Sequence, residues 1–440
     1  MSEFSWSRGG ESNSRPAVYD TAALPTELPR LLRISTWYKY YKRYMTRRIL
    51  GAVLVLAGIM VMAIQIWLKS PFSGEKRYLI LLQNQMELRP TGGFLGSYAV
   101  AKIKNGKLVD VSVQDIYEPD GRVTEYVEPP EPIQEAFQLG TLRLRDANWD
   151  PDFPKTAKTL MWYFKKAGEG EFDGVIATNL LVFQGALRLV GPIKLIDYGE
   201  EVTADKLWEK AQFYSQERFF PGSKQKREFL KDLAKGLLMK MGDAGLFQKL
   251  KLLNLAVKMA NEKQIMIYSN EGGFQKFLET VGWGGEVRQR NCPAWLVNCV
   301  ADSLMIVEAN LGVNKANCCV ERKARLEMKK NENGWDHKLT LIYENHSGDS
   351  AWGGKYKAWV RLIIPSSAGG EKGFWVEVPE GEESEYAVEY VLPGGNNPIF
   401  LSIQKQSGIQ EWPLELIIDE NGKKSVKQFS IRQDVSLQVR

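Results

Sequence analysis

One segment of the sequence joins a basic side chain to a glycine turn, a combination suited to binding an anion. Arg89 lies just beyond the apolar run at 77–83 (RYLILLQ) and precedes residues 90–93 (PTGG). The planar guanidinium of arginine can bond two phosphate oxygens at once, and adjacent glycines let backbone N–H groups point into one concavity. We therefore predict that Arg89, Gly92 and Gly93 contact a phosphate-like ligand. The alternative is a tight connection in which Arg89 pairs with Glu87 at the surface.

A second candidate lies in the acid-rich stretch 145–152 (RDANWDPD). Arg145 could contact the same ligand. Asp146, Asp150 and Asp152 could supply oxygens to Mg²⁺, which prefers carboxylates together with substrate phosphates. The alternative is that these residues cap a helix start, as aspartates in loops commonly do. Magnesium is thus a possible cofactor, and no metal ligand is assigned.

A third basic pair, Lys226 and Arg227, opens a segment of alternating charge that is expected to be helical. These two side chains either bind the ligand or belong to a solvated helix face. A histidine-based catalytic triad or a metal site with several histidines is not expected, because His337 and His346 are the only histidines.

The four cysteines fall in one short window, at Cys292, Cys299, Cys318 and Cys319. A location outside the cytoplasm favours disulfides, and Cys292 and Cys299 flank a turn-like segment that they could close. The alternative is a zinc site with four cysteine ligands, which adjacent cysteines rarely allow. The connectivity stays open.

Residues 49–68 (ILGAVLVLAGIMVMAIQIWL) form a nearly unbroken apolar run. Twenty helical residues span roughly 30 Å, the thickness of the hydrocarbon core of a bilayer. Basic residues gather before the run and few follow it, so the positive-inside rule places residues 1–48 in the cytoplasm as a basic, partly disordered tail. The sequence therefore predicts a single-pass cell-membrane protein whose large domain is extracytoplasmic.

The pattern of predicted secondary structure in the rest of the chain changes once. Residues 75–318 alternate apolar strands with amphipathic helices, including a hairpin at Asn105-Gly106, which predicts a layered α/β domain. Residues 319–440 contain short alternating strands separated by turn residues, which predicts an all-β, sandwich-like domain. The net charge of +5 over 440 residues gives no reason to expect nucleic acid as a partner.

Several motifs resemble domain-of-unknown-function family 4012, a group of bacterial membrane-anchored ectodomains. They are found at 82–96 (LQNQMELRPTGGFLG), 145–157 (RDANWDPDFPKTA), 172–179 (FDGVIATN), 189–195 (LVGPIKL), 308–316 (EANLGVNKA) and 404–408 (QKQSG), with Tyr356, Arg361 and Pro365. The resemblance covers about residues 77–440 and implies no activity.

The succession of a strand, an arginine-bearing loop, a hairpin, an RD pair and the FDGVIAT strand also resembles the LytR-CpsA-Psr phosphotransferases. Those enzymes move glycopolymers from polyprenyl-pyrophosphate lipids onto peptidoglycan. The resemblance implies an α/β/α domain in which Arg89, Arg145, Lys226 and Arg227 bind the ligand. Asp115 and Asp146 would be its catalytic carboxylates. The aspartate expected in the first loop is absent unless Asn84 or Glu87 replaces it.

Two functions follow from these patterns. One is an envelope enzyme or binder that acts on a lipid-linked glycan at the membrane. The other is a non-enzymatic scaffold or adhesion protein that contacts envelope polymers or proteins. An enzyme should bring Arg89, Arg145, Arg227 and a carboxylate to one pocket with apolar walls, whereas a scaffold should leave them scattered or paired.

Overall fold

The computed structural model describes residues 73–216, 225–296, 298–349, 352–394 and 397–439. All of them belong to the second of two compact units, which begins at Leu68. The predicted tail (1–48) and the predicted membrane segment (49–68) lie outside the described residues. Within the described ranges, no helix is both long and apolar enough to cross a bilayer.

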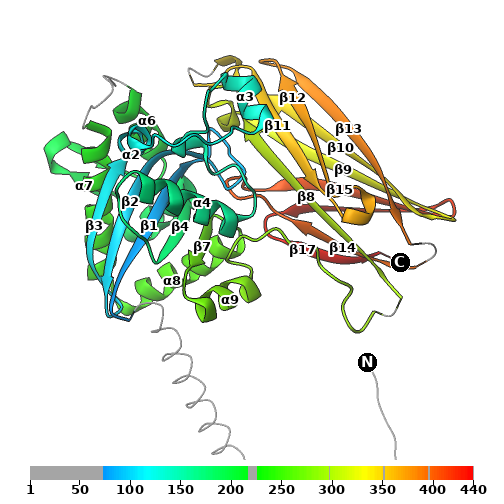
Figure 1. Ribbon diagram of the computed structural model, residues 1–440, viewed down its shortest axis with the longest axis horizontal. Coiled ribbons are helices and arrows are strands. Elements are labelled where there is room, and N and C mark those ends of the chain that lie inside the picture. The colour runs from blue at the N-terminus through cyan, green and yellow to red at the C-terminus, as the bar shows by residue number, and fades with distance from the viewer. Residues whose placement is uncertain (1–72, 217–224, 297, 350–351, 395–396, 440) are drawn as a thin grey trace, which may run out of the picture. The chain divides into compact units, whose positions relative to one another are not determined.

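A five-stranded mixed sheet organises the first part of the described chain (Figure 1). Its order is β3-β2-β1-β4-β7, and only the central β1 and β4 run parallel. The predicted hairpin turn is present, because Asn105 and Gly106 both have positive φ (51° and 78°), as a tight two-residue connection requires. The strands are β1 (Glu75–Asn84), β2 (Phe94–Lys104), β3 (Lys107–Asp115), β4 (Gly174–Asn179) and β7 (Ile265–Ser269).

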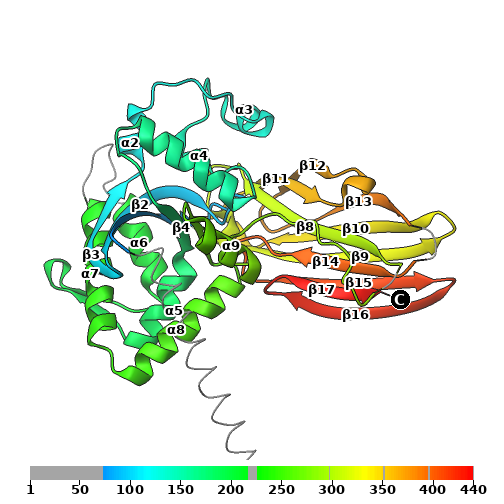
Figure 2. The same cartoon turned by 60° about the horizontal axis from the view of Figure 1, so that its bottom comes forward.

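Helices cover both faces of this sheet. On one face, α4 (Phe153–Lys166) starts at the cap Asp152, whose carboxylate accepts from the N–H of Lys155, and buries Leu160 and Phe164 against the strands. On the other face lie α5 (Leu180–Val190), α6 (Leu207–Gln216), α7 (Gln225–Asp243) and α8 (Leu246–Asn261). Figure 2 shows α8 alongside α5 at the lower edge of this region.

The remaining elements of the α/β region are short, apart from α9. They are α2 (Tyr117–Arg122), α3 (Glu131–Phe137), η2 (Leu144–Asp146), β5 (Ile193–Leu195), η3 (Ile196–Tyr198), β6 (Glu200–Val202) and α9 (Gly272–Val281).

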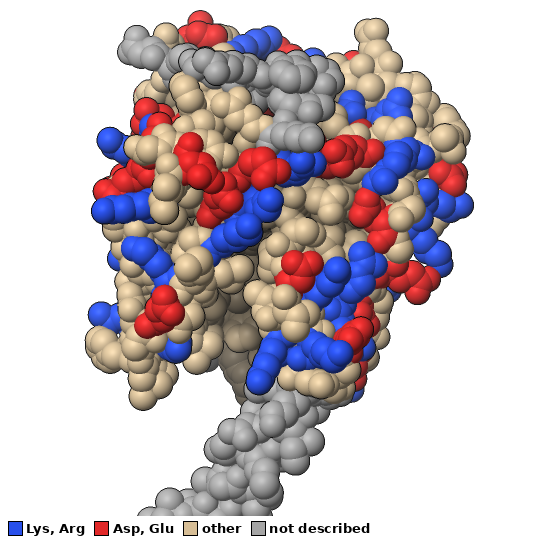
Figure 3. Space-filling view, turned by 90° about the vertical axis from the view of Figure 1, so that its left-hand side faces the viewer, with Lys and Arg blue, Asp and Glu red and all other residues tan. Residues whose placement is uncertain are grey.

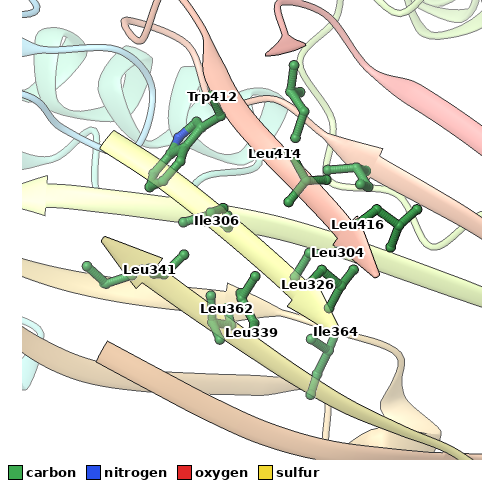
Figure 4. Close-up of a cluster of buried hydrophobic side chains, with 14 of the residues drawn as sticks. Leu304, Ile306, Leu326, Leu339, Leu341, Leu362, Ile364, Trp412, Leu414 and Leu416 are labelled. Carbon is green, nitrogen blue, oxygen red and sulfur yellow. The ribbon is translucent and has the colours of Figure 1, made fainter. Parts of the chain in front are cut away.

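Two further five-stranded sheets form the second region and pack their inner faces together. Their orders are β13-β10-β9-β15-β16 and β12-β11-β8-β14-β17. Leucines and isoleucines from both sheets, such as Leu304, Leu326, Leu341, Leu362 and Leu414, fill the space between them (Figure 4). This shared apolar core is what holds two sheets face to face.

The elements of this second region run from β8 to the C-terminus. They are β8 (Val300–Asn310), η4 (Ala316–Cys318), β9 (Val320–Asn331), β10 (Gly334–Asn345), η5 (Ser347–Asp349), β11 (Tyr356–Ile363), η6 (Ser366–Ala368), β12 (Glu371–Val378), β13 (Glu383–Pro393), β14 (Ile399–Gln404), β15 (Trp412–Glu420), β16 (Lys423–Ile431) and β17 (Val435–Val439).

The order predicted from sequence, a mixed α/β region followed by a β-rich region, is confirmed. The strand pairing moves the start of the β-rich region, because β8 precedes the predicted boundary at 318/319 yet pairs with β11 and β14. The region therefore starts near residue 300. Each of its sheets also contains one parallel pair, β9/β15 or β8/β14, which the alternating pattern did not predict. Within the α/β region, α6 begins at Leu207, and Thr203 caps only the preceding turn through the N–H of Lys206.

Candidate functional site

A pocket of about 510 Å³ lies between the first sheet and the helices α5, α6 and α7, which cover one of its faces. The strands β1, β2 and β3 form its floor, and α5, α6 and α7 form its walls. Its volume falls within the ~300–1,000 Å³ typical of small-molecule sites. Figure 3 shows the face on which β3 and α7 lie, with a hollow below a band of charged side chains.

The pocket exists because alternate residues of β2 differ in size. Ser97, Ala99 and Ala101 point toward the pocket, whereas Tyr98 and Val100 point into the core on the α4 side. Strand geometry sends successive side chains to opposite faces, so small residues on one face leave room there without weakening the other. The walls opposite the strands are apolar residues such as Leu230, Leu233 and Leu237 of α7.

Charged groups gather at one end of the pocket, beyond the carboxyl end of β1. The Nζ of Lys226 donates to the carbonyl of Gly96 at 2.9 Å, and the Nζ of Lys315 lies 3.8 Å from Oε1 of Glu87. Asn84 donates from Nδ2 to the same Glu87 oxygen at 3.2 Å. All four side chains line the pocket. Ligands of α/β sheets commonly bind outside the carboxyl ends of strands, so this end of the pocket is the one suited to the charged part of a ligand.

Both lysines at this end are poorly solvated. Burial lowers the pKa of Lys226, while the negative charges of Asp115 and Glu87 act in the opposite direction. Burial also lowers the pKa of Lys315, against the effect of Glu87. An ammonium group that has lost its water gains more from a bound anion than a solvated one does.

Tyr117 connects the charged end to two of the residues predicted from sequence. Its ring lines the pocket, and its N–H donates to Oδ1 of Asp115 at 2.9 Å. The guanidinium of Arg145 lies 5.4 Å from the centre of the Tyr117 ring. The structure therefore brings Lys226 to the pocket, places Asp115 near it without lining the pocket, and leaves Arg145 behind the tyrosine.

Arg89 and Asp146 do not reach the pocket. They form a buried ion pair at 3.1 Å, and Nη1 of Arg89 also donates to the carbonyls of Leu88 and Asn310. Because Asn310 belongs to β8, this arginine ties the α/β region to the β-rich region. This geometry does not support the prediction that Arg89 binds a ligand and that Asp146 is catalytic, since the two are buried and their opposite charges compensate each other.

Arg145 and Arg227 are also paired with acids. Arg145 contacts Oδ2 of Asp120 at 2.5 Å, and Arg227 lies 3.7 Å from Glu118 and 3.4 Å from Glu228. The three predicted arginines are thus paired rather than converging on one pocket with apolar walls. This is the arrangement that the sequence analysis expected of a scaffold rather than of an enzyme.

Gly92 and Gly93 serve close packing. A Cβ on Gly93 would stand 2.4 Å from the backbone of Asn84, and one on Gly92 would stand 2.6 Å from Oγ of Ser407. The carbonyl of Gly93 accepts from Nδ2 of Asn148. The alternative of a tight connection, left open by the sequence, describes this loop better than an anion-binding turn.

The two other aspartates of the 145–152 stretch have structural roles. Asp150 accepts from the N–H of Asp152 at 2.9 Å, and Asp152 caps α4. A group of possible metal ligands in the described part of the chain is instead Glu321, Glu344 and His346, on the surface of the β-rich region and far along the chain from the pocket residues.

The cysteines form two disulfides, Cys292–Cys299 and Cys318–Cys319. The first closes the loop suggested by the sequence. The second joins neighbours in the chain at the end of η4, which Lys315 precedes and Cys319 follows. With all four cysteines paired, the alternative of a zinc site with four cysteine ligands is wrong.

Sequence reasoning missed two pocket residues, Lys315 and Trp208. Lys315 lies inside the EANLGVNKA motif, so the motif carried a signal that a basic residue there has a role. The indole N–H of Trp208 is buried and finds no acceptor among the described residues. No spacing rule marks such a tryptophan, because its exposure to the pocket depends on how α6 packs.

The comparisons with known proteins give a family likeness over part of the chain and no activity. The profile of the family described as a protein of unknown function, DUF4012, matches residues 73–214. A comparison with curated proteins found no significant match.

Three solved structures resemble part of the chain. Protein gbs0355 from Streptococcus agalactiae is 12% identical over 49% of this chain and 76% of its own, with a TM-score of 0.31. Lin1025 from Listeria innocua is 11% identical over 48% and 80%, with a TM-score of 0.26. TagV from B. subtilis is 13% identical over 48% and 80%, with a TM-score of 0.27.

All three likenesses are weak, at 11–13% identity. At TM-scores this far below 0.5, they carry no argument for the activity, ligand or partners of this chain. The family resemblance seen in the sequence motifs is confirmed where the profile matches. The chain is thus similar to DUF4012, a family of unknown function, over residues 73–214.

Proposed function

We propose that this protein binds an isoprenoid lipid with a pyrophosphate headgroup, of the kind that carries glycans in bacterial envelopes, at the outer face of the membrane. One observation carries the proposal: the pocket is apolar along the sheet and has two poorly solvated lysines, Lys226 and Lys315, at one end. A ligand that matches this pattern has a hydrocarbon chain at one end and an anion at the other.

The apolar part of the pocket supports the hydrocarbon half of the ligand. Its length is set by α7, on which the twelve helical steps from Lys226 to Leu238 span about 18 Å. Removing apolar surface from water contributes about 25 cal/mol for each Å² buried, so an isoprenoid chain along this pocket gains affinity without specific contacts.

The charged end supports the pyrophosphate half. Lys226 and Lys315 come from α7 and from the loop after β8, and both approach Glu87. A pyrophosphate can contact both ammonium groups, whereas Glu87 partly neutralises them while the pocket is empty. Hydrogen bonds to charged groups are worth roughly 1.5–3 kcal/mol each, so these lysines can set the preference for a charged headgroup.

The proposal is binding and not transfer. A transferase of the type that the sequence resembles would use Arg89 and Asp146 on the ligand, and here they are buried against each other. The location rests on residues 49–68, whose apolar run would anchor the domain to a membrane. A protein of this kind would hold, present or pass on a lipid-linked glycan.

The test is a titration of the full chain in lipid nanodiscs, with empty nanodiscs as the blank. Geranyl pyrophosphate, geraniol and inorganic pyrophosphate separate the two halves of the ligand. We expect geranyl pyrophosphate to bind most tightly, and Lys315→Met to weaken it by about 10- to 150-fold, the equivalent of one charge-assisted hydrogen bond. Lys329→Met, an exposed lysine on β9, is the matched control and should leave affinity unchanged.

A second variant tests the hydrocarbon half. Ala99→Phe places a ring in the pocket from the floor, so it should abolish binding of geranyl pyrophosphate while leaving weak binding of inorganic pyrophosphate in place. Equal affinities for geranyl and inorganic pyrophosphate, or no binding of either, would overturn the proposal and leave the scaffold function.

A further inference from the structure

Helix α8 exposes its large apolar side chains instead of burying them. Leu246, Phe247, Leu250 and Leu253 are between 55% and 77% exposed. Their spacing of one, three and three residues places them on one face of the helix. A contiguous exposed apolar face of this kind marks a surface that meets another apolar phase.

Helix α7, which precedes α8, also has apolar side chains at the surface toward its end. Leu238 and Met239 are also exposed, and only Ala244 and Gly245 separate α7 from α8. We call these six side chains the α7–α8 face (Leu238, Met239, Leu246, Phe247, Leu250 and Leu253).

Lysines accompany the α7–α8 face. Between residues 238 and 258 the sequence has four lysines and a single acid, Asp243. The Nζ of Lys251 lies 4.6 Å from the centre of the Phe247 ring, so a positive charge sits directly beside the apolar side chains. Apolar residues mixed with lysines on one helix face are the composition of helices that lie in the headgroup layer of an anionic bilayer.

The α7–α8 face lies near the apolar end of the pocket. Leu238 lines the pocket together with Leu108, which is itself exposed near the β2–β3 turn. The turn residue Asn105 exchanges hydrogen bonds with Gly74, at the beginning of β1. The described chain therefore begins at the end of the domain where the pocket is apolar.

The short stretch of chain before Ser73 limits the distance between the predicted membrane segment and the beginning of β1. The predicted membrane segment ends at Leu68, and five residues of extended chain reach at most about 18 Å from there to Ser73. If residues 49–68 span the membrane as predicted, a tether that short keeps the beginning of β1 close to the lipid headgroups.

We infer that the α7–α8 face docks onto the surface of a lipid bilayer with anionic headgroups. Its leucines and Phe247 enter the interface, and Lys249, Lys251 and Lys258 contact lipid phosphates. The inference rests on the predicted membrane segment and not on the proposed ligand. A second copy of this chain is a poorer occupant of the face, because it would place lysines against lysines. Docking would also turn the apolar end of the pocket toward the lipid from which a hydrocarbon chain enters.

The experiment places a fluorescent probe on the face in the full chain. Leu250→Cys is labelled with an environment-sensitive nitrobenzoxadiazole after incorporation into nanodiscs that contain phosphatidylglycerol. The four native cysteines are paired in disulfides, so the introduced thiol is the one that reacts. We expect a blue-shifted emission that lipids with a nitroxide on the acyl chain quench. Val426→Cys on β16, which is equally exposed, is the matched control and should be neither shifted nor quenched.

Two further arms keep the inference open to refutation. Adding Phe247→Glu and Leu253→Glu to the labelled protein should remove the quenching without changing the thermal unfolding midpoint, because both side chains are exposed. Replacing phosphatidylglycerol with phosphatidylcholine should reduce it. A probe at residue 250 that is unquenched overturns the inference, and a blue shift without quenching does so as well, since protein rather than lipid would then cover the face.

Discussion

Nη2 of Arg89 donates to Oδ1 of Asp146 across 3.1 Å, and about 5% of each side chain is exposed. Removing one member of a buried ion pair leaves the other charge without compensation, at a typical cost of 3–5 kcal/mol. We expect Arg89→Met to lower the thermal unfolding midpoint strongly, as followed by circular dichroism of the full chain.

The matched control for that variant is Arg432→Met, which breaks an exposed pair with Glu411. Surface pairs contribute about 0–1 kcal/mol, so its midpoint should barely move. If Arg89→Met unfolds no earlier than Arg432→Met but loses the lipid, Arg89 is a ligand-binding residue after all.

The contact between Gly92 and Gly408 gives a second prediction. Gly408 has φ +83°, and a Cβ there would stand 2.0 Å from the carbonyl oxygen of Gly92. Gly408→Ala should therefore separate the α/β and β-rich regions and destabilise the protein by well over the ~1–2 kcal/mol of left-handed strain alone.

Gly422 isolates the strain from the clash. Its φ is +84°, and nothing lies within 4 Å of its added Cβ. Gly422→Ala should cost only the strain, which a urea unfolding series on both variants measures. Equal losses of stability in the two variants would show that the contact between Gly92 and Gly408 contributes nothing.

The lysines of the pocket predict how lipid binding depends on pH. Burial lowers the pKa of Lys226 and of Lys315 in the empty protein, and the protonated form is the one that binds an anion. Affinity for geranyl pyrophosphate should therefore fall as pH rises, and the fall should begin below the ordinary lysine pKa of about 10.4. Calorimetry from pH 7 to 9.5 tests this, and a constant affinity across the range would contradict it.

Lys405 predicts a pH dependence of stability. Burial, with the positive charge of Lys263 as the second cause, lowers the pKa of Lys405 to about 7. Its Nζ donates to the backbone carbonyls of Glu262 and Gln406. Both of these acceptors are uncharged. The unfolded chain keeps this group near its ordinary pKa, so between about pH 7 and 10 the unfolded state binds more protons.

The free energy of unfolding should consequently rise with pH across that window, and below pH 7 the full cost of the buried charge remains. Lys405→Met should lose this slope, whereas Lys423→Met, exposed on β16, should keep it. Urea unfolding at pH 7, 8 and 9 distinguishes them; parallel pH profiles for both variants would assign the slope to other groups.

Local patterns predicted the elements that depend on neighbouring residues. The turn at Asn105-Gly106 and the helix α4 required only signals within a few positions. The pairing of β8 with β14, about a hundred residues later, has no such signal, which is why the boundary at 318/319 was placed too late.

The predicted positions of several site residues differ from the structure for a similar reason. Residue type marked Arg89 and Asp146 as chemically capable, but it could not show that they face each other across 57 positions of chain. Lys226 and Asp115 were both identified, because one stands at the start of a helix and the other at the end of a strand. They lie close enough for the charge of Asp115 to act on Lys226. Lys315 depends on the fold of the β-rich region, and no periodicity reveals it.

The backbone N–H of Lys315 donates to the carbonyl of Trp352 at 3.2 Å, so the charged end of the pocket depends on a part of the chain made late. A ribosome adds roughly 5–20 residues each second, and it passes residue 352 about 6 to 25 seconds after Lys226. During that interval the nascent protein has the floor of the pocket but only one of its two lysines in place. If the pocket binds an anionic lipid as proposed, its complete charged end forms only after the β-rich region has been made.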